Sequence, residues 1–400
     1  PVSMPGMMET ILNIGLTSKT IPHMIKMSKN EGFVYDSYRR LITMYADVVM
    51  EKALGLNKSS RSIRELMEKE LESVKKYKGY KNDSNMKAKD WKALSNKYLR
   101  MVEKEFGIPF PDDHYEQLYG AIAAVFESWN GKRAKEYRSF EKISSSMGTA
   151  VNVQAMVFGN LGKDCGTGVA FTRNPSTGEN IFFGEWLPNA QGEDVVAGIR
   201  TPHPVAGNSK NSLSVAMPEA FKELDGVRKK LENHFDDMQD IEFTIQEKKL
   251  WMLQTRRGKR TGIAAIKIAT DMVKEKLITK EVAVSRVRPH QIYESLLKNI
   301  DPKDVENSLP ISLGLPAGPG ASCGIAVFTA ERAEELGKKN KKVILVREET
   351  SPEDIHGMHY SEGILTSRGG LTSHAALVAR GWGKSCVVGC QDLTIDKSHT

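Results

Sequence analysis

Apolar residues recur at intervals of three and four from residue 35 to residue 141, which is the spacing of one helical face. The clearest runs are Leu41, Met44, Val48 and Val49, then Leu94, Leu99, Met101 and Val102, then Leu118, Ile122, Val125 and Phe126. This pattern predicts a helical region over about residues 35–145. Within it, the polar, Lys-rich stretch 75–89 is predicted to be a solvated surface loop, with a partner-binding site as the alternative.

The spacing becomes strand-like after Gly148, where Val151, Val153 and Ala155 alternate with polar residues. Further on, the sequence predicts two hairpins. The first joins residues 168–173 to 181–184 through a Pro- and Gly-containing turn. The second joins residues 241–245 to 250–254 through a turn at residues 247–249.

A change of composition marks the best domain boundary. A helical stretch, 262–287, leads to the Gly- and Pro-rich segment 315–320. Beyond it, short strand candidates alternate with short helix candidates, which predicts a small β/α domain. The strand candidates are 324–328, 342–346, 363–366 and 386–388, and the helix candidates are 330–336, 352–358 and 374–380.

Composition removes several classes of protein. The chain has 400 residues, 40% hydrophobic and 27% charged, and no apolar run long enough to span a membrane. The net charge of +7 is unclustered, so a nucleic-acid partner gains little support. Four cysteines without a Cys-x-x-Cys pair predict buried free thiols and a reducing compartment. The chain starts at Pro1 without an initiator Met and stops at Thr400 after a strand-like segment, so we expect both ends to be cut.

The segment 368–381 carries the most informative histidine. Gly369 and Gly370 permit a tight turn, Thr372 or Ser373 can cap the following helix, and Gly381 can end it. These features place His374 in the first turn of a helix, where free backbone N–H groups would stabilise a phosphoryl group on the imidazole. The alternative is a histidine that only packs or caps.

A polar face is predicted on the second hairpin. A turn centred on Lys248 places Glu242 opposite Gln254 and Asp240 opposite Arg256, all on one face. The apolar residues of the hairpin, Ile241, Phe243, Ile245, Trp251 and Leu253, would fill the other face. Such a polar face suits Mg²⁺ bridging ATP phosphates, although simple solvent exposure is the alternative.

The loop of residues 3–6 contains a hydroxyl at Ser3 and a flexible backbone at Gly6. Such a loop can present backbone N–H groups to phosphates, whereas an ordinary turn is the alternative.

Several of these motifs resemble those of one enzyme family. Residues 369–376 and 349–354 are similar to the swivelling phosphohistidine domain of phosphoenolpyruvate-utilising enzymes. Residues 3–10, 36–40, 166–175 and 189–194 resemble the nucleotide domain of one branch of that family. The resemblance implies an α/β (α+β) fold with an ATP-grasp-like nucleotide domain over residues 1–260, interrupted by the helical insertion. A helical linker, 261–310, and a swivelling β/α phosphohistidine domain, 311–400, would follow.

That branch interconverts ATP, phosphate and pyruvate with AMP, diphosphate and phosphoenolpyruvate. The resemblance implies that His374 carries the phosphoryl group, and that Mg²⁺, with a monovalent cation as a further candidate, is the cofactor. The other implied sites are Ser3, Gly6, Asp240 and Arg256 for ATP and phosphate, Glu242 and Gln254 for the metal, and Thr372 for regulatory phosphorylation. Alternatives are the branch in which water accepts the γ-phosphoryl group and a non-catalytic nucleotide-binding or phosphocarrier protein.

Partners and location follow from the same resemblance. We expect ATP, AMP, phosphate and diphosphate as ligands of this chain, and pyruvate or phosphoenolpyruvate on a barrel domain beyond Thr400. Further ATP-contacting Lys and Arg residues of the family would lie before Pro1. We expect a homodimer in the cytoplasm, with no nucleic-acid or membrane partner, and a targeting signal upstream of Pro1 would be invisible.

Overall fold

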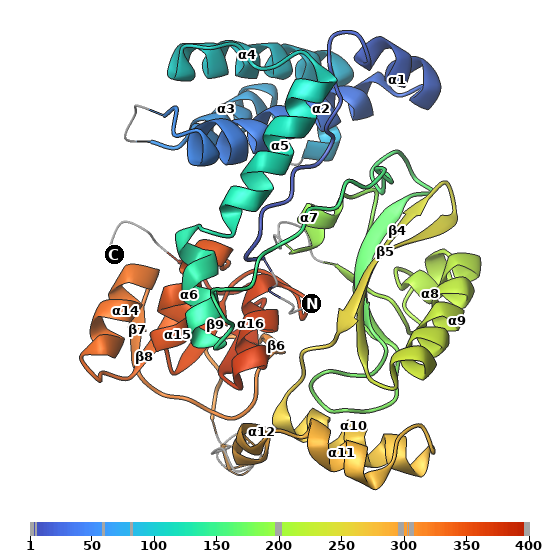
Figure 1. The fold of residues 1–400 in the computed structure, drawn as a ribbon, viewed down its shortest axis with the longest axis vertical. Coiled ribbons are helices and arrows are strands. Elements are labelled where there is room, and N and C mark those ends of the chain that lie inside the picture. Colours follow the sequence, from blue (N-terminus) through green and yellow to red (C-terminus); the bar gives the residue numbers. More distant parts are fainter. Residues whose placement is uncertain are drawn as a thin grey trace. The chain divides into compact units, whose positions relative to one another are not determined.

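The computed structural model describes residues 4, 6–57, 61–80, 83–196, 202–294, 300–301, 303 and 308–395. The chain divides into two compact units, each described here by itself (Figure 1). We call Gly6–Met156 the helical unit, and Val157–Thr400 with Pro1–Pro5 the sheet unit. Helices and strands occur together along the chain, which confirms the predicted mixed α/β class.

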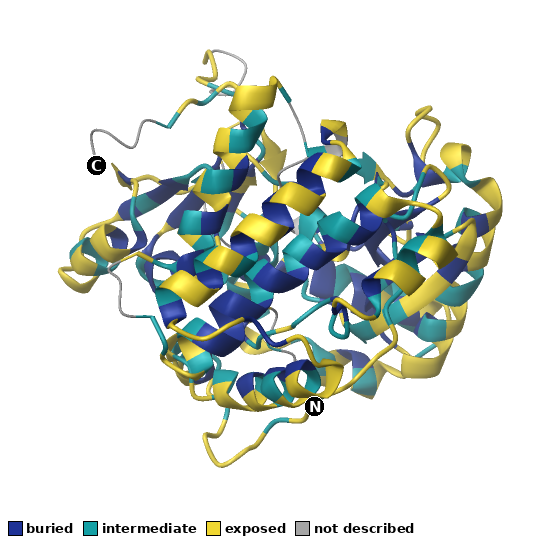
Figure 2. Cartoon of the chain, turned by 90° about the horizontal axis from the view of Figure 1, so that it is seen from above, coloured by how far each residue is buried: buried dark blue, intermediate teal, exposed yellow. Residues whose placement is uncertain are grey.

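The helical unit confirms the helical spacing of the sequence. Its elements are α1 (Ile21–Ser28), α2 (Glu31–Tyr45), the π-helix η1 (Ala46–Ala53), α3 (Ile63–Lys78), the 3₁₀ turn η2 (Asp83–Asn85), α4 (Ala88–Phe106), α5 (His114–Ser128) and α6 (Lys132–Phe140). Asp113 starts α5 by accepting the N–H groups of Tyr115 and Glu116, and Gly107 ends α4 with φ of 75°. Figure 2 shows buried and exposed faces on these amphipathic helices.

Two local expectations from the sequence are wrong. The Lys-rich stretch is only partly a loop, because α3 continues through Lys78 and α4 begins at Ala88. Lys75 lies in α3 and contacts Glu72 at 2.6 Å and Asp83 at 3.0 Å. The alternating segment 151–155 forms no strand among the described residues, and Val153 is 68% exposed. Alternation alone does not make a strand without a neighbouring strand to pair with.

The first sheet of the sheet unit is antiparallel and has the order β3-β2-β1-β4-β5. Its strands are β1 (Gly166–Phe171), β2 (Phe183–Pro188), β3 (His203–Pro204), β4 (Gln239–Gln246) and β5 (Lys249–Arg257). The associated helices are α7 (Gly192–Val196), α8 (Leu213–Ala216) and α9 (Pro218–Phe235). Helices α8 and α9 cover one face of this sheet, where Trp186, Leu224 and Phe243 are fully buried (Figure 1). Both predicted hairpins are confirmed.

The β4–β5 hairpin contains an irregularity that the sequence did not reveal. Its turn has two residues, Glu247 and Lys248, both with positive φ, so Gln246 lies opposite Lys249. A bulge at Leu253 then shifts the register by one residue. Because the turn has two residues, Trp251 lies opposite Thr244 and is 41% exposed. Leu253 lies in the bulge and outside the buried cluster of the apolar face, so the expectation that Trp251 and Leu253 join that face is wrong.

The second sheet has the order β6-β10-β9-β8-β7, with β7 to β10 parallel and β6 antiparallel to β10. Its strands are β6 (Leu315–Pro316), β7 (Ile325–Val327), β8 (Val343–Arg347), β9 (Gly363–Thr366) and β10 (Ser385–Val388). Its helices are α14 (Ala330–Lys338), η3 (Pro352–Asp354), α15 (Ile355–Tyr360) and α16 (His374–Trp382). These elements confirm the predicted small β/α arrangement.

Between the two sheets the chain forms α10 (Gly262–Lys274), α11 (Lys280–Arg286) and α12 (Pro289–Glu294). Part of the predicted linker 261–310 lies outside the described residues, so its boundaries stay predictions. No described helix is long and apolar enough to cross a membrane. The cysteines are free, and Cys165, Cys386 and Cys390 are buried as expected, whereas Cys323 is exposed.

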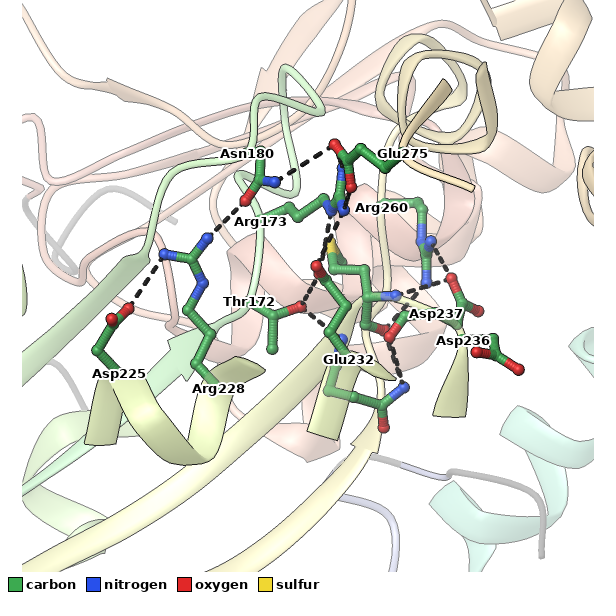
Figure 3. Close-up of polar contacts among 12 residues, drawn as sticks. Thr172, Arg173, Asn180, Asp225, Arg228, Glu232, Asp236, Asp237, Arg260 and Glu275 are labelled. Carbon is green, nitrogen blue, oxygen red and sulfur yellow. Dashed lines mark hydrogen bonds and ion pairs between the residues drawn. The ribbon is translucent and has the colours of Figure 1, made fainter. Parts of the chain in front are cut away.

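A buried ion-pair network fixes the turn after β1 (Figure 3). Arg173 is fully buried and binds Glu232 of α9 through Nε at 3.0 Å and Nη2 at 2.9 Å. Its Nη1 atom also donates to Glu275 at 3.0 Å, and Thr172 donates its hydroxyl to Glu232 at 2.7 Å. Through these ion pairs, Arg173 links the end of β1 to α9 and to the end of α10.

Candidate functional site

His374 is the first residue of α16, as the sequence predicts. Ser373 occupies the N-cap position with extended backbone, but its side chain makes no capping hydrogen bond. Gly369 has φ of 95°, a conformation that favours glycine. The helix continues through Gly381, so the predicted end there is wrong; Gly383 ends α16 with φ of 65°.

The imidazole of His374 is held from the neighbouring strand-to-helix segment. The Thr350 hydroxyl lies 3.1 Å from Nδ1 of His374, and Thr350 is 9% exposed. When Nδ1 carries the proton and donates it to Thr350, the lone pair is on Nε2. In that tautomer Nε2 is the nitrogen that can act as a nucleophile.

The loop before His374 is attached to the first sheet through one carboxylate. Glu185 of β2 accepts the backbone N–H groups of Leu371 at 3.1 Å and Thr372 at 3.2 Å. It also accepts the Thr372 hydroxyl at 2.7 Å, and Thr372 is fully buried. A Cβ atom at residue 370 would collide with the Glu185 carboxylate, so the contact requires glycine there.

The predicted polar face is present on the β4–β5 hairpin. Asp240 lies opposite Arg256 and Glu242 lies opposite Gln254, as expected. Arg256 donates from Nε to Asp240 at 2.8 Å and from Nη2 to Glu242 at 3.0 Å. Burial raises the pKa of both carboxyl groups above their ordinary values, whereas the Arg256 guanidinium acts in the opposite direction.

The residues of this face suit a hard divalent cation. Glu242 and Gln254 offer side-chain oxygens on the same side of the sheet, which is the ligand type that Mg²⁺ prefers. Oδ1 of Asp240 is buried without a hydrogen-bond partner, so one more oxygen is unused. The described residues contain no complete set of three acidic, His or Cys groups for a metal. A magnesium ion here would therefore need ligand oxygens from phosphates or water as well.

The His374 loop and the polar face lie on the same side of the sheet. Glu185 is opposite Val169, and Val169 is opposite Glu242 on the next strand. Directly opposite residues project from one face, and adjacent strands are about 4.8 Å apart, so Glu185 and Glu242 are separated by about 10 Å along the sheet. Leu377 of α16 also packs on the apolar cluster that contains Val169.

The remaining predicted residues have different outcomes. Ser3 lies outside the described residues. Gly6 is an exposed turn residue of the helical unit with φ of 72°, a conformation that favours glycine. The structure thus brings together His374, Thr372, Asp240, Glu242, Gln254 and Arg256 within the sheet unit.

Two residues with direct contacts to this site were not predicted as site residues. Thr350 falls inside the resembling motif 349–354, but its sequence distance of 24 residues from His374 hides the contact. Glu185 is 187 residues from Thr372, so only the strand register and the packing of α16 reveal it. The only signal in the sequence was an acidic residue within an otherwise aromatic and glycine-containing strand, residues 182–186.

Comparison with known proteins places this geometry in a class of enzymes. A family model described as "PEP-utilising enzyme, mobile domain" matches residues 339–400, which include β8 to β10 and His374. A second model, "Pyruvate phosphate dikinase, AMP/ATP-binding domain", matches residues 1–215 and 204–277.

Individual relatives cover the whole chain. It is 51% identical over 407 residues to "Pyruvate, phosphate dikinase" of Rhizobium meliloti, covering 99% of this chain and 44% of the relative. Identity is 50% to "Pyruvate, phosphate dikinase 2" of Zea mays, over 100% of this chain and 43% of the relative. The chain belongs to the pyruvate, phosphate dikinase family, and it spans less than half the length of these curated relatives.

Proposed function

We propose that this chain carries the ATP-dependent half of the pyruvate, phosphate dikinase reaction, with His374 as the phosphoryl acceptor. One observation carries the proposal. The loop that starts the His374 helix is hydrogen-bonded to Glu185, on the same sheet face as Asp240, Glu242 and Arg256. An acceptor next to a face of charge-stabilising side chains is the arrangement that phosphoryl transfer requires.

The first step forms a bond between Nε2 of His374 and the β-phosphorus of ATP. The bond from that phosphorus to the α,β-bridging oxygen breaks, and AMP leaves with the electron pair. In the second step an oxygen of inorganic phosphate attacks the γ-phosphorus. The bond from the γ-phosphorus to the β,γ-bridging oxygen breaks, and that oxygen stays on the phosphoryl group bound to His374. Diphosphate is thereby formed from inorganic phosphate and the γ-phosphoryl group. Transfer of the remaining phosphoryl group from His374 to pyruvate would complete the reaction for which the relatives are named.

The side chains have distinct roles in this scheme. In the tautomer with the proton on Nδ1, Thr350 accepts a hydrogen bond from Nδ1 of His374 and the Nε2 lone pair is available. Asp240 holds the Arg256 guanidinium, and Arg256 contacts the nucleotide phosphates and neutralises charge that develops during transfer. Mg²⁺, held by Glu242 and Gln254 together with phosphate oxygens, would supply further charge neutralisation. Ser3 and Gly6 would cover the phosphates as part of their loop.

The domain assignment belongs to the same proposal. Residues 1–260 form an ATP-grasp-like nucleotide domain, residues 261–310 a helical linker, and residues 311–400 a phosphohistidine domain. The two matching family models support this order along the chain.

Thr372 is proposed as a regulatory phosphorylation site. Its hydroxyl is buried against Glu185, so a phosphate on Thr372 and the contact with Glu185 exclude each other. A phosphate carries about −1.5 to −2 charges and would meet the carboxylate directly.

The decisive experiment is His374→Asn in the gene product that carries this sequence. We expect the variant to lose diphosphate-supported exchange between ATP and AMP, because asparagine has no imidazole nitrogen to accept the phosphoryl group. The exposed histidine of α9, in His234→Asn, serves as the matched control and should retain exchange. Wild-type exchange by His374→Asn would disprove the proposal.

A further inference from the structure

Arg380, near the end of α16, is one of the largest fully buried side chains of the protein. Its Nη2 atom donates to the Leu371 carbonyl at 3.1 Å, within the loop that precedes His374. Its Nε and Nη1 atoms have no hydrogen-bond partner. A buried guanidinium with unused donors is costly, and such groups require an explanation.

Arg173, on the first sheet, uses its buried guanidinium differently. Arg173 is also fully buried, and Nε, Nη1 and Nη2 all donate to carboxylates. Arg380 instead has its guanidinium 5.9 Å from the centre of the Phe171 ring, on β1. Its side chain therefore reaches from α16 to the first sheet without forming a closed ion pair there.

The charges around Arg380 come from that sheet. Burial lowers the pKa of Arg380 to about 10, while Cys386, Glu185 and Asp240 act in the opposite direction. Asp240 also has an unpartnered polar atom, because its buried Oδ1 accepts no hydrogen bond while Oδ2 is bound to Arg256. The Arg380 guanidinium, with two unpartnered nitrogens on α16, and the unpartnered carboxylate oxygen of Asp240 on β4 thus attract each other.

We propose that Arg380 is a positioning residue for phosphoryl transfer, which ties the loop before His374 to the charge of the polar face at Asp240. The proposal rests on the proposed function of His374. Through the Leu371 carbonyl, Arg380 fixes the start of α16, and through its charge it favours the arrangement in which α16 lies on the first sheet. The alternative role is purely local, in which Arg380 only supports its own loop.

Two phosphoryl donors separate these roles. ATP must be bound by the polar face before it can phosphorylate His374. Phosphoramidate is a small donor that needs no nucleotide site: a nitrogen of His374 bonds to phosphorus, the P–N bond of the donor breaks, and ammonia leaves. The measured quantity is the ratio of the rate of His374 labelling from β-³²P-labelled ATP to the rate from ³²P-phosphoramidate. Because phosphoramidate can also label histidine in an unfolded chain, the two rates are compared at equal folded fraction, which circular dichroism measures.

The variants are Arg380→Met, which removes the charge but keeps much of the stem, and Arg380→Lys, which keeps the charge but loses the planar fork. We expect Arg380→Met to lower the ratio by about 100-fold, the usual cost of a misplaced reacting group. Most of the loss should be in the maximal rate and not in the KM for ATP. Arg380→Lys should recover part of the ratio.

The control is Arg332→Met, at an exposed arginine of α14 that pairs with Glu335 on the surface. It should leave the ratio unchanged. An unchanged ratio in Arg380→Met, whether both rates fall equally or neither rate falls, would show that Arg380 supports only its loop and would overturn the proposal. Labelling of wild-type protein by phosphoramidate but never by ATP would instead contradict the proposed function itself.

Discussion

Replacement of Arg173 by Met tests how the nucleotide-side sheet is held together. The substitution fills the fully buried position with an apolar side chain of similar length and removes the cation shared by Glu232 and Glu275 (Figure 3). Glu232 is 7% exposed and would remain as a buried, uncompensated carboxylate. Glu275 is about one-third exposed in its side chain and can be hydrated by water.

The size of the effect follows from this difference in exposure. Breaking a buried ion pair by removal of one partner costs about 3–5 kcal/mol, and the partial exposure of Glu275 favours the lower end, about 3 kcal/mol. For a cooperative unit of this size, that loss corresponds to a decrease of roughly 6–12 °C in the unfolding midpoint. Urea and thermal unfolding, followed by circular dichroism, measure both quantities.

A second substitution separates charge from packing. In Arg173→Met combined with Glu232→Gln, no uncompensated charge remains at Glu232, so the double variant should be more stable than Arg173→Met alone. The Arg173 hydrogen bond also lowers the pKa of Glu275 from its ordinary value of 4.5. The stability from this pair is present above pH 4.5 and is lost as the pH falls through the lower, folded-state value, in wild type only. A loss below about 1 kcal/mol in Arg173→Met would show that the network is solvated and would refute the reasoning.

Three further predictions concern the site and its surroundings. Thr372→Asp should abolish labelling of His374 by ATP, because a carboxylate would face Glu185, and an active Thr372→Asp variant would contradict this. Thr372→Val should lose the hydrogen bond to Glu185, worth about 1 kcal/mol, and keep measurable labelling. Glu242→Ala should slow labelling at least about 100-fold with little change in unfolding midpoint, and a collapse of stability with unchanged labelling of folded protein would show a structural role. Arg256→Ala should slow labelling to a similar extent but also lower the midpoint, because buried Asp240 loses its ion-pair partner. Burial lowers the pKa of Lys384 from 10.5 to about 8, so the unfolded state binds more protons between these values and stability should rise from pH 8 to 10.5 relative to Lys384→Met; a flat difference would refute the shift.

The hairpin shows how a sequence pattern can predict a site correctly through an incorrect detail. The expected turn was centred on Lys248, whereas the actual turn has two residues and the strands gain a bulge at Leu253. The two differences cancel at the functional end, so Asp240 still faces Arg256. They do not cancel near the turn, so Trp251 lies opposite Thr244 and not on the predicted apolar face.

The strands and helices around His374 were predictable because glycines, caps and short apolar runs are local signals. The contact between Glu185 and Thr372 depends on the packing of α16 against β2, which no local pattern encodes. The same holds for Arg380, whose position at the end of a helix gives no sign of its burial. Long-range contacts of this kind follow from the register of pairing strands, which only the folded chain defines.

The bulge at Leu253 lets β5 carry one residue more than β4 without any change at the polar face. With Glu247 and Lys248 fixed in their turn, deletion of Leu253 would continue the turn-side register along the whole strand. The residues that are now Gln254 and Arg256 would still lie opposite Glu242 and Asp240, because Gln254 already pairs with the residue next to Phe243, the partner of Met252. Homologous chains can therefore vary or lack the residue at this position, and the guanidinium keeps its place beside the carboxylates in both cases.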